Sequence, residues 1–102
     1  MRIAVLDAGA WGTALAIAFA HRHDVALWAR DAAQAAAMAA DHENRRYLPG
    51  CPLPSALQPT ADFAAATTDA DLLVLAPPLA GLRATLEQLA ARQVVTPFLW
   101  VC

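Results

Sequence analysis

The stretch Ile3-Ala4-Val5-Leu6-Asp7-Ala8-Gly9-Ala10-Trp11-Gly12 decides the fold, together with Thr13-Ala14-Leu15-Ala16-Ile17-Ala18-Phe19-Ala20, which follows it. Its first four residues are apolar, as is typical of a strand buried on both faces. The following segment alternates alanine with larger apolar side chains, and alanine favours helix. Two glycines lie between these segments, three positions apart. The sequence therefore predicts a strand, a tight turn and a helix.

Such a turn points the unpaired N–H groups of the helix, and the positive end of its dipole, at whatever lies above the strand. A pyrophosphate fits there, and the usual dinucleotide-binding fingerprint is G-x-G-x-x-G. Gly9 and Gly12 match its last two glycines, whereas Asp7 stands in place of the first. The loop expected to bind the pyrophosphate consists of Gly9, Ala10, Trp11 and Gly12. The alternatives are that the glycines serve packing alone, and that Trp11 is a core anchor rather than a cover over the cofactor.

The composition predicts one α/β domain over residues 1–102. An apolar fraction of 59% is enough for one core, and alanine-rich helices alternate with strands rich in valine and leucine. The net charge is −2, and the seven basic residues are all arginines, with no cluster larger than Arg45-Arg46, so no nucleic-acid partner is expected. Cys51 and Cys102 lack metal-ligand spacing, which indicates reduced thiols in the cytoplasm.

No membrane segment is expected, because the apolar run over residues 8–20 is too short to span a bilayer. Arg2 followed by apolar residues superficially resembles a secretory leader. However, Asp7 interrupts the apolar stretch, and the two glycines have the spacing of a phosphate loop. We therefore interpret the segment as the first strand and helix of the domain.

The rest of the chain repeats the alternation of strand and helix. Asp31 is placed to cap the second helix, with Gln34 completing a capping box. An ordered irregular loop is expected over residues 43–54, where Pro49-Gly50 and further prolines exclude helix and central strand. Further strands are expected at residues 25–28, 57–60, 71–76 and 96–101, and further helices at 32–41, 63–66 and 80–92. This order predicts a Rossmann-like open parallel sheet with helices on both faces.

Arg30 follows the second predicted strand, where dinucleotide-binding domains place the group that contacts the adenosine ribose. An arginine there is suited to a 2′-phosphate through charge-assisted hydrogen bonds, which favours NADP(H) or the use of both NADP and NAD. The alternative is a solvated surface arginine. Asp31 is better explained as a helix cap than as a ribose ligand.

No catalytic residue is predicted within the chain. His21 and His23 flank a surface turn far from the carboxyl edge of the predicted sheet, and Asp69 and Asp71 precede a strand at the opposite edge. The spacing supports no Ser/His/Asp or Cys/His arrangement, and the chain contains no lysine. Because the chain stops at the end of a predicted strand, we expect these residues to be the front part of a longer protein.

Five segments carry a family resemblance. They are Gly9-Ala10-Trp11-Gly12-Thr13-Ala14-Leu15-Ala16, Leu27-Trp28-Ala29-Arg30-Asp31, Glu43-Asn44-Arg45-Arg46-Tyr47-Leu48-Pro49-Gly50, Ala70-Asp71-Leu72-Leu73-Val74-Leu75-Ala76-Pro77 and Leu99-Trp100-Val101-Cys102. A tryptophan in the glycine loop and an Asn-x-x-Tyr-Leu-Pro-Gly loop are more discriminating than the glycine pattern alone. Over its whole length, the chain resembles the N-terminal part of bacterial NAD(P)-dependent glycerol-3-phosphate dehydrogenases.

The resemblance implies a cytoplasmic enzyme that transfers a hydride between NAD(P)H and glycerone phosphate, giving sn-glycerol 3-phosphate for phospholipid synthesis. It assigns residues 9–12 to the pyrophosphate and Arg30 to the adenosine side. The catalytic lysines and a helical domain for the phosphorylated substrate are expected beyond Cys102. A sheet edge exposed after the fifth strand would also favour association into homo-oligomers.

Three departures from the family pattern affect the expected site. The carboxylate of Asp7 would repel a pyrophosphate, which at about 5 Å costs about 1 to 3 kcal/mol and weakens binding about five- to a hundred-fold. The turn at residues 21–23 lacks the family's glycine, and Pro78 stands where a serine is frequent. One rival interpretation is a ketopantoate-reductase-like 2-hydroxyacid dehydrogenase, against which Tyr47-Leu48-Pro49-Gly50 argues. The other is a non-catalytic nucleotide-binding or interaction module.

Overall fold

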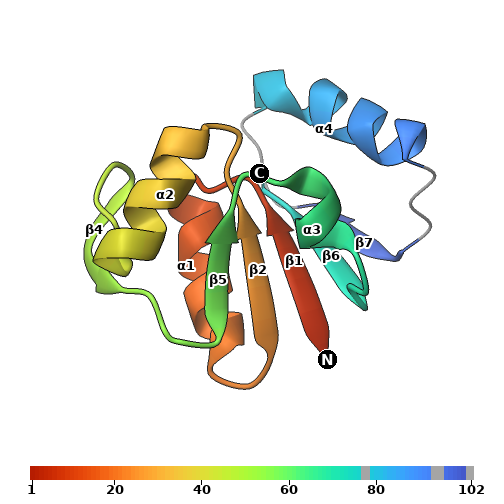
Figure 1. Ribbon diagram of the computed structural model, residues 1–102. Coiled ribbons are helices and arrows are strands. Elements are labelled where there is room, and N and C mark those ends of the chain that lie inside the picture. Colours follow the sequence, from red (N-terminus) through yellow and green to blue (C-terminus); the bar gives the residue numbers. More distant parts are fainter. Residues whose placement is uncertain (77–78, 93–95, 101–102) are drawn as a thin grey trace.

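The computed structural model describes residues 1–76, 79–92 and 96–100, and its main element is a parallel sheet of five strands (Figure 1). In chain order the strands are β1 (Arg2–Leu6), β2 (Asp24–Trp28), β5 (Leu57–Thr60), β6 (Leu72–Leu75) and β7 (Phe98–Trp100). Their order across the sheet is β5-β2-β1-β6-β7, with β1 at the centre. All four pairings are parallel. The predicted Rossmann-like sheet is therefore confirmed.

Alternating side chains of the central strand supply two apolar layers. Ile3 and Val5 lie in one buried cluster, and Ala4 and Leu6 lie in another, because successive side chains of a strand point to opposite faces. The sheet is thus covered on both faces, as Figure 1 shows, and this explains why its strands are apolar throughout. The four helices are α1 (Ala10–Ala20), α2 (Ala32–Asp41), α3 (Phe63–Thr67) and α4 (Leu79–Ala91).

Each face has its own pair of helices. Ala16 of α1 and Met38 of α2 belong to the cluster that contains Ile3, whereas Phe63 of α3 and Leu89 of α4 belong to the cluster that contains Leu6. On the second face, the rings of Trp28 and Phe63 meet edge to face with their centroids 5.0 Å apart. Each pair of helices thus packs on one face of the sheet, against every second side chain of the strands.

The segment predicted as an irregular loop over residues 43–54 is instead a small antiparallel hairpin. Its strands are β3 (Glu43–Asn44) and β4 (Leu48–Pro52), which form a sheet separate from the main one. Gly50 has a φ of 83°, and its N–H donates a hydrogen bond to the Glu43 carboxylate. The prolines exclude a central strand, as expected, but a short two-stranded sheet tolerates them because few of its N–H groups need a partner.

The helix ends confirm one capping prediction and overturn another. The Asp31 carboxylate accepts a hydrogen bond from the Ala33 N–H at the start of α2. Gln34 does not complete a capping box, because its amide donates to the Ala8 carbonyl at 3.1 Å. A contact with the loop after β1 therefore replaces the local one. At the end of α1, the Arg22 and His23 N–H groups donate to the Phe19 carbonyl, so this helix closes without a glycine cap.

The other predicted boundaries agree with the structure to within a few residues. The helix expected to begin at residue 13 begins at Ala10, so the glycine loop itself contributes the first turn of α1. The Pro77-Pro78 pair and the expected strand end at Val101 lie outside the described residues. None of the described helices is both long enough and apolar enough to cross a membrane.

Candidate functional site

The glycine loop lies at the carboxyl end of the central strand. From β1 the chain proceeds through α1 to β2 on one side, and later through α3 to β6 on the other side. The direction in which strands are added thus reverses next to β1. In open α/β sheets, ligands bind outside the carboxyl ends of the strands at such a reversal. The fold therefore places the predicted loop where a ligand is expected.

Close packing explains Gly12, whereas the surroundings of Gly9 are open. A Cβ atom at Gly12 would lie 2.1 Å from the Asp7 carbonyl oxygen, a backbone atom that moves only with the loop. A Cβ at Gly9 would have no heavy atom within 4 Å. Gly9 is also the N-cap residue of α1, and no side chain caps this helix. Within the described part of the chain, the space around Gly9 is therefore open, and the first-turn N–H groups of α1 are available to an anion.

Trp11 is not a core anchor, because 67% of its surface is exposed. Ala10 is exposed as well. Both residues belong to the first turn of α1, which has no acidic side chain. The large exposed indole beside an uncapped helix start is consistent with the second interpretation of Trp11, a cover over a bound molecule.

Asp7 keeps the loop on the course that a glycine would give it. Its φ is 100°, in the region that favours glycine and that aspartate tolerates better than most residues. The Asp7 N–H donates to the Trp28 carbonyl at 3.1 Å, and the Ala76 N–H donates to the Leu6 carbonyl at 3.1 Å. The end of β1 is thus held on both sides, and the first turn of the loop survives without its glycine.

Arg30 is placed at the carboxyl end of β2, as predicted, but it already has an anionic partner. Its Nη2 lies 3.0 Å from Oδ2 of Asp7, and the two side chains are 44% and 17% exposed. Asp7, which departs from the glycine fingerprint, therefore contacts Arg30, the residue predicted to lie on the adenosine side. Asp31, the helix cap, forms a separate ion pair with Arg46 at 3.3 Å.

A buried amide connects the hairpin to the glycine loop. Asn44 of β3 is 1% exposed, and its Nδ2 donates to the Ala8 carbonyl at 2.9 Å and to Thr13 Oγ1 at 2.7 Å. Its Oδ1 accepts from the Tyr47 N–H at 3.2 Å. Gln34 donates to the same Ala8 carbonyl. Sequence reasoning did not select Asn44 or Gln34 as site residues, although Asn44 opens the Asn-x-x-Tyr-Leu-Pro-Gly motif.

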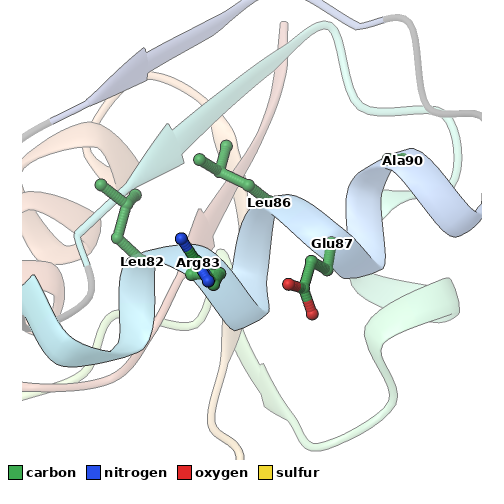
Figure 2. Close-up of a pocket in the computed structure, with 5 residues that line it drawn as sticks. All are labelled: Leu82, Arg83, Leu86, Glu87 and Ala90. Atoms are coloured by element: carbon green, nitrogen blue, oxygen red, sulfur yellow. The ribbon is translucent and has the colours of Figure 1, made fainter.

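One surface depression formed by described residues lies away from this loop. A shallow depression of about 430 Å³ is lined by Leu82, Arg83, Leu86, Glu87 and Ala90, all from α4. Figure 2 shows Leu82 and Leu86 on one side of the helix, with the Glu87 carboxylate pointing away from them. None of the residues predicted to bind the cofactor lines this depression.

Other titratable residues do not form a second site among the described residues. His21 is exposed, and the Asp71 carboxylate accepts a hydrogen bond from the Arg2 N–H at the amino end of β1. No group of three or more His, Cys, Asp or Glu in the described part of the chain has a geometry that could hold a metal ion. The chemistry of this part of the chain is thus concentrated around the glycine loop and Arg30.

The fold and the uncapped glycine loop together define a dinucleotide-binding domain of the Rossmann type. Residues 2–100 match the family described as the N-terminus of NAD-dependent glycerol-3-phosphate dehydrogenase, and the chain belongs to this family. The family assignment favours the dehydrogenase resemblance over the ketopantoate-reductase alternative.

Named relatives agree with this assignment. The chain is 58% identical over its full length to the glycerol-3-phosphate dehydrogenase [NAD(P)+] of Aromatoleum aromaticum, and 54% identical to that of Thiobacillus denitrificans. It covers 31% of each of these relatives. The crystal structure of glycerol-3-phosphate dehydrogenase from Coxiella burnetii superposes with a TM-score of 0.91 at 30% identity, over 97% of this chain and 31% of that one. This chain therefore corresponds to about a third of the length of these proteins.

Proposed function

We propose that this chain binds NADP(H) or NAD(H) as the cofactor domain of a glycerol-3-phosphate dehydrogenase. The loop of Gly9, Ala10, Trp11 and Gly12 would hold the pyrophosphate, and Arg30 would face the adenosine side. One observation carries the proposal: α1 begins at the carboxyl end of the central strand with no side-chain cap and no acid in its first turn. A helix start of this kind attracts a phosphate.

The surrounding residues fit a bound diphosphate. The space around Gly9 is open, so backbone N–H groups can approach phosphate oxygens closely. Gly12 allows α1 to begin directly against the Asp7 carbonyl, which keeps the loop short. Asn44 donates a hydrogen bond to the Ala8 carbonyl, which fixes the position of the loop before a ligand binds. A preorganised loop of this kind lowers the entropy cost of binding.

A bound nicotinamide would supply or accept the hydride, and the protein would bind and orient it. In this chain the first-turn N–H groups of α1 would donate to the phosphates, while the exposed Trp11 would shield them from water. We propose hydride transfer to glycerone phosphate for a protein of the relatives' length. In that protein, residues 1–102 would supply cofactor binding, and a further helical domain would hold the phosphorylated substrate and the catalytic lysines.

The same proposal covers location and assembly. A cytoplasmic location follows from the family resemblance and agrees with the exposed free thiol of Cys51. Association into homo-oligomers is proposed for a protein of the relatives' length.

The test is a calorimetric titration of the chain with NADPH and, separately, with NADH. Saturable binding of at least one nucleotide is expected. The variant designed to block binding is Gly9→Glu. The backbone conformation of Gly9 suits any residue, and the glutamate side chain would project into open space, so the fold should be retained. Its carboxylate would repel the phosphates and weaken binding. The matched control is Ala18→Glu, an exposed position on the same helix. Absence of binding, or equal binding by both variants, would refute the proposed site.

A further inference from the structure

Asp7 and Arg30 form a contact that the fingerprint does not contain. Asp7 takes the place of the first glycine, at a φ of 100°, and its carboxylate lies 3.0 Å from the Arg30 guanidinium. The contact joins the end of β1 to the end of β2. It therefore links the expected phosphate loop, which Asp7 precedes, to Arg30, the expected adenosine contact.

The guanidinium also lies close to α4. A Cβ atom built on Gly81 of α4 would lie 1.9 Å from Nη2 of Arg30, so the guanidinium packs closely against this glycine. Gly81 is buried, whereas the Arg30 side chain is 44% exposed. Arg30 thus contacts both a carboxylate and the first part of α4, and it does not extend freely into solvent.

We propose that Asp7 is a specificity-determining residue that lowers the preference for NADP(H) over NAD(H) by occupying Arg30. This inference rests on the proposed function. A 2′-phosphate can pair with Arg30 only by displacing the carboxylate, so the cofactor exchanges one charge-assisted contact for another of similar strength. NAD(H) has no 2′-phosphate, and its binding leaves the ion pair intact. The ion pair therefore weakens the binding of NADP(H) but not that of NAD(H).

A second effect of Asp7 falls on both cofactors equally. Its carboxylate carries the same sign of charge as the pyrophosphate, and this repulsion does not depend on the 2′ position. The two effects are therefore separable: general repulsion changes both affinities by one factor, whereas occupation of Arg30 changes their ratio. Because Arg30 is partly exposed, we expect the change in ratio to be about three- to fivefold, within the range of solvent-screened pairs.

The experiment is a double-mutant cycle on the dissociation constants for NADPH and NADH, measured by calorimetry. Asp7→Asn removes the charge but keeps the size and the tolerance of positive φ. We expect it to raise the preference for NADPH about three- to fivefold. Arg30→Gln should leave the preference within about twofold in the native background, and should abolish the gain in the Asp7→Asn background.

The control is Asp31→Asn, which removes a neighbouring carboxylate that pairs with Arg46 instead and keeps a good helix cap. It should leave the preference unchanged. If Asp7→Asn tightens both cofactors by one common factor, or if the two substitutions act additively on the ratio, the specificity role is wrong while the proposed function stands. If no variant binds either nucleotide although circular dichroism shows each one folded, the proposed function itself fails.

Discussion

Replacing Asn44 by alanine tests whether the hairpin fixes the glycine loop. The side chain is 1% exposed and makes three hydrogen bonds, with Nδ2 donating to Ala8 and Thr13 and Oδ1 accepting from Tyr47. Three of the four hydrogen bonds that an amide side chain can make are thus formed, including both that Nδ2 can donate. Of these partners, the Ala8 carbonyl keeps the bond from Gln34 after the substitution.

The magnitude follows from this inventory. A typical hydrogen bond contributes about 1 kcal/mol net, so losing three costs about 3 kcal/mol in the free energy of unfolding. Water cannot easily replace the amide, because Thr13 is also fully buried. In a domain of this size, each kcal/mol lowers Tm by about 4–8 °C, so Tm should fall by about 12 °C or more. The affinity for nucleotide should fall as well, because the loop would have to be ordered on binding.

The assay is urea unfolding followed by far-UV circular dichroism, alongside the nucleotide titration described above. Gln34→Ala is the matched control, since it removes one bond to the same Ala8 carbonyl from a partly buried side chain. Its cost should be about 1 kcal/mol or less. If Asn44→Ala costs no more than Gln34→Ala, the hairpin does not fix the loop, and the reasoning about this buried amide is wrong.

Two further substitutions test local packing. Gly12→Ala should lower the free energy of unfolding in urea by about 3 kcal/mol, because its Cβ would meet the Asp7 carbonyl oxygen. Gly9→Ala is the control and should change this free energy by less than about 1 kcal/mol, because its surroundings are open. Similar values for the two variants would contradict the packing role of Gly12. Trp28→Phe should lower the free energy of unfolding by about 2 kcal/mol, because it removes the hydrogen bond from Nε1 to the Ala61 carbonyl and reduces packing. If Tm stays within about 2 °C of the native value, the loss is less than about 1 kcal/mol, and this bond contributes little to stability.

The sequence predicted the main sheet well because its strands are buried on both faces. Apolar runs of this kind, such as 72–75 between turn residues, depend only on neighbouring residues and on chain order. Right-handed crossovers then join such strands into one parallel sheet. The glycine loop was predictable for the same reason, since its turn and the helix after it are local features.

The connections between distant segments were not predictable in this way. Gln34 has the spacing of a capping box, yet it contacts Ala8, which lies 26 positions earlier. Asn44 reaches the same carbonyl from 36 positions away. A polar residue in a proline-rich segment gives no periodic signal, so neither the hairpin nor its buried amide follows from propensity. Only the three-dimensional approach of the hairpin to the loop after β1 brings these groups together.

Arg30 shows how such a connection changes the interpretation of a correctly placed residue. Its position at the end of β2 follows from the strand pattern, and its charge alone favours a 2′-phosphate. The carboxylate that neutralises it lies 23 positions earlier, in a loop that aspartate can enter only because it tolerates a φ of 100°. A substitution at Asp7, just before the proposed phosphate loop, would therefore also change the charge available at the proposed adenosine contact, Arg30. For that reason, we expect cofactor preference in this chain to depend on the Asp7–Arg30 pair rather than on Arg30 alone.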